Sequence, residues 1–95
     1  MLFMVMSDPR PERPVEIGTR QTSFWDWLQP LKDNGTVKAC WVKTGRGAIV
    51  VFDVKDHEML HDLINAWSDC VPAHFTVYPL IDPAYQERRA RGNVR

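Results

Sequence analysis

The chain has 95 residues, 44% of them hydrophobic, which is enough for one domain with one modest core. Twelve basic residues balance twelve acidic ones, so no overall charge attracts nucleic acid or an anionic membrane. No apolar run approaches the roughly 20 residues that a membrane-spanning helix needs. Cys40 and Cys70 lack metal-type spacing, and we interpret them as small hydrophobic residues with reduced thiols in a cytoplasmic protein.

An apolar strand opens the chain, and a proline-rich loop follows it. Residues 1–6 are all apolar, which is typical of a strand that is covered on both faces. The segment 7–14 contains three prolines, each of which removes a backbone donor, and we predict a loop there.

A helical pattern comes next, over residues 15–29. Phe24 and Leu28 fall on one side of such a helix and are expected to face the core. Pro30 predicts a kink or a short second turn, because it lacks a backbone donor and clashes one turn back. The Asn-Gly pair at 34–35 predicts the end of the helix.

Two strands joined by a tight turn occupy the middle of the chain. The first covers residues 36–43, where Val37 and Trp41 are predicted to share one face. The second, residues 48–54, is an apolar run rich in β-branched residues. The glycines on either side of Arg46 permit a tight turn, so we predict that these two strands are antiparallel.

A second amphipathic helix, a fourth strand and a polar tail complete the chain. The helix is predicted over residues 56–67, with Asp56 as its N-cap. Residues 73–80 predict a strand at the edge of the sheet. Residues 84–95 are arginine-rich and predict a polar tail outside the single domain, which covers residues 1–83.

The element order β-α-β-β-α-β predicts an α+β ferredoxin-like fold. Such a fold has a four-stranded antiparallel sheet with two helices on one face. The strands remain apolar on the other face, so we expect a second copy or a larger assembly to cover that face by sheet packing.

Several short motifs stand at characteristic places along the chain. They are Met1-Leu2-Phe3, Gly35-Thr36, Val51-Phe52-Asp53-Val54, Leu60-His61-Asp62 and Val77-x-Pro79-Leu80. Together they resemble the muconolactone delta-isomerase family, over residues 1–6 and 35–83. The Phe-Asp-Val…Leu-His-Asp segment is the most specific part of this resemblance.

The resemblance implies a ferredoxin-like dimeric α+β barrel that assembles through its sheets, as a dimer or as a decameric ring. It also implies an enzyme of aromatic catabolism that moves a proton across an unsaturated lactone ring, without metal or organic cofactor. This sequence departs from the family pattern in two places, which predicts a relative with a changed pocket. Only Asp26 is a carboxylate in the stretch 22–27, and the segment between the middle strands is shortened to residues 45–47.

Two residues are candidates for the base of such a reaction. Asp26 lies between two tryptophans, which would desolvate it on the covered side of the sheet; the alternative is that it faces solvent. His61 is the second candidate, with structural packing against the sheet as the alternative. His57 and His61 lie four residues apart, but no third ligand follows at useful spacing, so we predict no metal site.

Six further residues are candidates for substrate binding. Arg46 and Lys43 could hold a substrate carboxylate, or they could be solvent-exposed turn residues. The aromatic and histidine candidates could line a pocket, or they could lie in the core or at a subunit interface. They are Trp25, Trp41, His74 and Tyr78.

Two functions follow from this pattern. The first is a muconolactone isomerase-like, cofactor-free isomerase that acts on a small unsaturated lactone or a cyclic, aromatic-derived acid. The second is a non-catalytic, oligomeric small-molecule-binding or accessory protein on the same fold. Two ionisable groups that converge on a cavity with a basic residue would favour the enzyme, whereas a cavity closed by Trp25 and Trp41 would exclude it.

Overall fold

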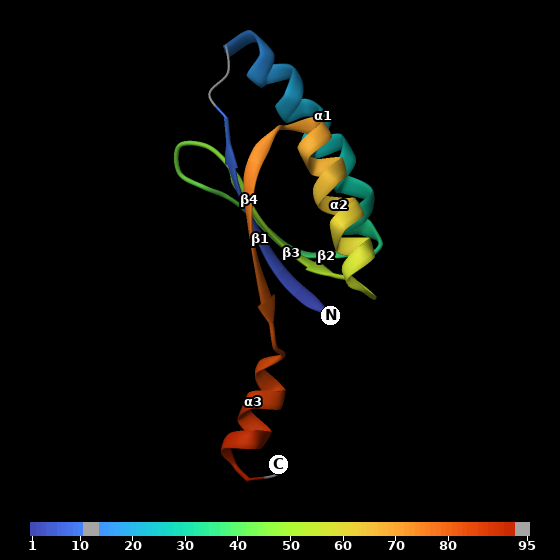
Figure 1. Ribbon diagram of the computed structural model, residues 1–95, viewed down its shortest axis with the longest axis vertical. Coiled ribbons are helices and arrows are strands. Elements are labelled where there is room, and N and C mark those ends of the chain that lie inside the picture. Colours follow the sequence, from blue (N-terminus) through green and yellow to red (C-terminus); the bar gives the residue numbers. More distant parts are fainter. Residues whose placement is uncertain (11–13, 93–95) are drawn as a thin grey trace.

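The computed structural model describes residues 1–10 and 14–92. Its elements, in chain order, are β1 (Leu2–Pro9), α1 (Pro14–Asp33), β2 (Val37–Val42), β3 (Ala48–Asp53), α2 (His57–Cys70), β4 (Ala73–Leu80) and α3 (Pro83–Ala90). The four strands form one antiparallel sheet in the order β2-β3-β1-β4, which confirms the predicted ferredoxin-like fold. Figure 1 shows α1 and α2 side by side on one face of this sheet, and α3 extending away from both.

The core lies between the sheet and the two helices that cover it. Alternate residues of β1 point toward the helices, so Phe3, Val5 and Ser7 are buried, while Met4 and Met6 between them are half-buried. The helices contribute Phe24, Leu28, Leu60 and Trp67 to this core. The Trp67 indole lies at its centre, with ring centroids 5.3 Å from Phe24, 5.0 Å from Phe75 and 6.3 Å from Phe52.

The first strand is longer than the sequence predicted. Residues 7–9, predicted to begin a loop, pair with the edge strand β4 and extend β1 to Pro9. Pro9 lacks a backbone donor, but a strand can accommodate a proline where it pairs with an edge strand only, as β1 does here with β4. The three prolines therefore placed the predicted end of the strand too early. Residues 11–13 of the predicted loop lie outside the described residues.

A bulge in β2 changes which face its residues occupy. The register shifts between Val37 and Ala39, so Val37 pairs with Phe52 on the buried face, whereas Trp41 pairs with Ile49 on the other face. The prediction that Val37 and Trp41 share a face was therefore wrong. The bulge adds one residue to β2, so the side chains after it point to the opposite face from the one that a regular strand would give.

The helix ends follow the predicted capping chemistry more closely. The Asp56 carboxylate accepts the Met59 N–H at 2.8 Å, which confirms it as the N-cap of α2. Helix α1 passes through Pro30 and continues to Asp33, beyond the predicted residue 29. Gly35 follows with φ of 85°, the left-handed conformation of a helix C-cap.

The predicted polar tail contains a short helix, α3. The Asp82 carboxylate accepts the Ala84 N–H at 2.8 Å, and Pro83 occupies the first turn, where its missing donor costs nothing. Arg91 and Glu87 add an ion pair one turn apart. All residues of α3 are exposed, and the remainder of the predicted tail, 93–95, lies outside the described residues.

Candidate functional site

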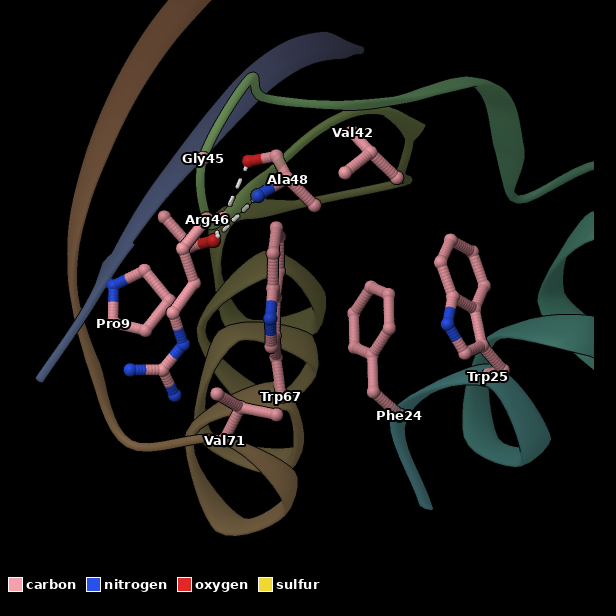
Figure 2. A pocket seen from close by; sticks show the side chains of 11 residues that line it. Pro9, Phe24, Trp25, Val42, Gly45, Arg46, Ala48, Trp67 and Val71 are labelled. Carbon is pink, nitrogen blue, oxygen red and sulfur yellow. Dashed lines mark hydrogen bonds between the residues drawn. The ribbon is translucent and has the colours of Figure 1, made fainter. Parts of the chain in front are cut away.

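A cavity of about 290 Å³ lies on the helix-covered side of the sheet, near the ends of β1 and β2 and the start of β3 (Figure 2). Most of the described residues that line it are apolar, and among them Arg46 carries a permanent charge. The lining residues are Ser7, Pro9, Phe24, Trp25, Val42, Gly45, Arg46, Gly47, Ala48, Trp67 and Val71.

Three aromatic rings form one wall of the cavity. Figure 2 shows Trp67, Phe24 and Trp25 in a row, and adjacent ring centroids are 5.3 Å and 5.0 Å apart. Trp67 is 1% exposed, whereas Trp25 is 43% exposed at the outer end of the row. A wall of this kind offers dispersion and edge-to-face contacts to a planar ring.

The glycine turn between β2 and β3 brings Arg46 to the cavity. The Lys43 N–H donates to the Gly47 carbonyl at 2.9 Å and closes the turn, and Gly45 and Gly47 have φ of 92° and 111°. The Arg46 guanidinium donates from Nη1 to the carbonyl of Arg10 at the end of β1. In Figure 2 it lies beside Pro9 and Val71, across the Trp67 ring from Phe24.

Ser7 is a lining residue that the sequence analysis missed. Its hydroxyl accepts the Ala48 N–H at 2.9 Å and lies 3.4 Å from the Ala48 carbonyl, to which it donates. The signal for it was a lone serine at an inward position of an apolar strand, where a buried hydroxyl needs partners. The predicted loop from residue 7 onward hid that signal.

Lys43 lies beside the cavity and does not line it. Its ammonium group donates to the Ser7 carbonyl at 3.0 Å and pairs with the Asp8 carboxylate. The hydrogen bond and the charge of Lys43 hold the pKa of Asp8 below its usual range, and His74 adds a smaller effect in the same direction.

The two candidate bases are exposed, and neither lines the cavity. Asp26 occupies an exposed position of α1, while the neighbouring Trp27 packs on Trp67 with ring centroids 6.4 Å apart. This arrangement matches the alternative in which Asp26 faces solvent. His61 is exposed on α2, and its Nε2 lies 3.0 Å from the Asn65 amide nitrogen.

Three other predicted binding residues lie on the face of the sheet opposite the helices. Trp41 is 69% exposed and Tyr78 is 47% exposed, and His74 is exposed opposite Asp8 in the β1–β4 ladder. Of the predicted site residues, the cavity therefore brings together only Arg46 and Trp25.

Within the described residues, no group of three or more His, Cys, Asp or Glu side chains could hold a metal ion. His57 instead packs its ring edge-on against Phe3, with centroids 5.7 Å apart. Burial raises the pKa of the Cys40 and Cys70 thiols, which keeps both in the less reactive protonated form. The part of the chain that the structure describes has no helix with the length and apolarity to cross a bilayer.

Fold and cavity together define an α+β protein of ferredoxin-like type with a ligand-sized space between sheet and helices. The chain belongs to the family described as a domain of unknown function, DUF3303, whose model matches residues 1–88. No curated protein sequence matches it significantly.

Among the solved structures that share this fold are two enzymes. One is 5-chloro-2-hydroxyhydroquinone dehydrochlorinase from Burkholderia phenoliruptrix AC1100 in complex with 2,5-dihydroxybenzoquinone, with a TM-score of 0.71 and 16% identity over 90% of this chain and 98% of that chain. The other is muconolactone isomerase, with a TM-score of 0.68 and 24% identity over 86% of this chain and 90% of that chain. The resemblance seen in the motifs is therefore confirmed as one of fold, whereas the family shown is DUF3303.

Proposed function

We propose that this chain binds a small, planar, unsaturated ring compound with an acidic oxygen, and acts on it as a cofactor-free proton-transfer enzyme. The observation that carries the proposal is the cavity itself, an aromatic wall with the Arg46 guanidinium beside it. Its volume of about 290 Å³ lies at the lower end of the range for ligand sites, which suits a single ring.

Charge and shape in the cavity define the class of ligand. The rings of Trp67, Phe24 and Trp25 favour a planar partner. The Arg46 guanidinium is permanently charged and presents several donors, so it favours a carboxylate, phenolate or enolate oxygen. In a proton transfer, the same group would stabilise the negative charge that develops on the enolate oxygen.

The names of the two similar structures support the enzymatic part of the proposal. Both are names of enzymes, and one of these proteins holds 2,5-dihydroxybenzoquinone, a planar ring that bears oxygens. The particular proton transfer that we propose is a muconolactone isomerase-like reaction on an aromatic-derived lactone or acid. A cytoplasmic location stays a prediction.

A second candidate function is binding without catalysis. It is favoured by the positions of Asp26 and His61, because both are exposed and neither lines the cavity of its own chain. In this case the aromatic wall and Arg46 would hold a ligand, but none of the described lining residues would act as a base to remove its proton.

We also propose that a second copy covers the open face of the sheet. Large apolar side chains there, including Trp41 and Tyr78, are exposed, and sheet packing would bury them.

Calorimetric titration with benzoate and with benzamide, its neutral analogue, tests the binding part. We expect the chain to bind benzoate, and Arg46→Met to weaken benzoate about tenfold while benzamide changes little. Lys38→Met is the matched control, since Lys38 is an exposed cation that does not line the cavity. Absence of benzoate binding, or an equal loss in both variants, would contradict the proposal.

Proton exchange of muconolactone in D₂O, followed by NMR, then separates the two candidate functions. Exchange that depends on the chain and is slowed by Arg46→Met supports the enzyme. Benzoate binding without any chain-dependent exchange of muconolactone favours the non-catalytic protein.

A further inference from the structure

Ser7 links the end of β1 to the start of β3, where the backbone ladder between these strands ends. The last backbone pair is Met6 opposite Ile49. At the next position the Ser7 hydroxyl bonds the Ala48 N–H at 2.9 Å and the Ala48 carbonyl at 3.4 Å. Ser7 is 2% exposed, so these bonds are shielded from water, and the loss of a partner would be costly.

Lys43 ties the other side of the turn to the same residue. Its ammonium group donates to the Ser7 carbonyl at 3.0 Å and pairs with Asp8. Ser7 thus contacts both flanks of the turn, Ala48 through its side chain and Lys43 through its backbone.

The turn also packs directly on the backbone of β1. A Cβ atom added at Gly47 would lie 2.4 Å from the Ser7 carbonyl oxygen, so the two backbones are already as close as a glycine allows. Arg46 immediately precedes this contact, and its side chain donates to the Arg10 carbonyl, one residue beyond the end of β1. The direction of the Arg46 side chain therefore depends on how β1 holds the turn.

We propose that Ser7 is a positioning residue that, together with the Lys43–Asp8 pair, holds the glycine turn so that Arg46 faces the cavity. The inference rests on the proposed function, because an anionic ligand is what Arg46 would hold there. The Ser7 hydroxyl lies at the cavity, but it donates its proton to the Ala48 carbonyl, so its proposed effect on an anionic ligand is exerted through Arg46.

Two variants and one control test this role. Ser7→Ala removes the hydroxyl, and Asp8→Asn weakens the Lys43 pair at an exposed position where folding is not at risk. Ser23→Ala is the control, since Ser23 is exposed on α1 and does not line the cavity. The readouts are the heteronuclear NOE of the Arg46 Nε–H group without ligand, and the ratio of the benzoate and benzamide dissociation constants.

We expect Ser7→Ala to lower the Arg46 NOE and to reduce the preference for benzoate about threefold, which is less than the roughly tenfold loss expected for Arg46→Met. Asp8→Asn should shift both readouts in the same direction by a smaller amount, and Ser23→Ala should shift neither. A purely structural role would weaken both ligands equally and leave their ratio unchanged, which would overturn the inference. If the unaltered chain binds neither probe, the proposed function fails, and the Arg46 NOE still decides whether Ser7 positions the side chain.

Discussion

The two faces of the sheet carry similar apolar side chains but differ in what covers them. On the helix side, Val5, Val50 and Phe52 are fully buried beneath α1 and α2. On the opposite face, Trp41 and Tyr78 remain 69% and 47% exposed. The cavity and the Arg46 side chain that lines it belong to the first face. The hydropathy of the strands therefore does not tell which face is buried. That difference comes from the placement of α1 and α2 on one face only.

The largest expected effect separates two tryptophans on opposite faces. Trp67→Ala empties the centre of the core and should lower the free energy of unfolding by about 3–5 kcal/mol. Trp41→Ala removes a mostly exposed ring and should change monomer stability by about 0.5 kcal/mol or less. Urea unfolding measures both values.

The same Trp41 variant tests the proposed cover of the open face. If a second copy packs there, Trp41→Ala should weaken assembly, as read by light scattering at several concentrations. A chain that is monomeric at all concentrations would contradict the proposed packing.

A smaller effect distinguishes two glycines of the Arg46 turn. Both have positive φ, so alanine at either position should cost about 1–2 kcal/mol in backbone strain. Gly47→Ala adds a clash with the Ser7 carbonyl and should cost about 3 kcal/mol in total, whereas Gly45→Ala meets no atom within 4 Å. Equal losses of stability in the two variants would show that the turn does not rest on β1.

The smallest expected effect is a pH dependence of stability at Asp8. Lys43 lowers the pKa of Asp8 in the folded chain. The ion pair therefore stabilises the fold above about pH 4, and this stabilisation is lost as the pH falls through the lowered pKa of Asp8. Asp8→Asn should therefore reduce stability slightly at neutral pH and flatten the acid limb of a plot of Tm against pH. An unchanged acid limb would exclude a contribution from this pair.

Much of the covered face could be predicted from the sequence, because its signals are local. The apolar run of β1, the cap at Asp56 and the glycines on either side of Arg46 each depend on a few neighbouring residues. The bulge at Val37–Ala39 could not be predicted, since it depends on how β2 meets β3. Helix α3 was missed because a polar composition predicted a tail, although Asp82 and Pro83 form a good helix start.

The candidate site was predicted less well than the fold. Arg46 and Trp25 line the cavity as the sequence analysis suggested, since a short glycine turn and a helix face limit where they can lie. Asp26 and His61 were chosen for their chemistry, and nothing local determined whether they would face solvent or the sheet. Ser7 depends on a contact with Ala48, forty-one positions away in the sequence, which no local pattern shows.

Amide chemical-shift mapping with benzoate tests most directly whether the helix-covered face holds the ligand. We predict the largest shifts at the backbone amides of Gly47 and Ala48 and at the indole N–H of Trp67, with little change at Met4 and Met6 on the open face. Shifts concentrated at Met4 and Met6, with Ala48 and Trp67 unchanged, would contradict the assignment of the cavity as the binding site.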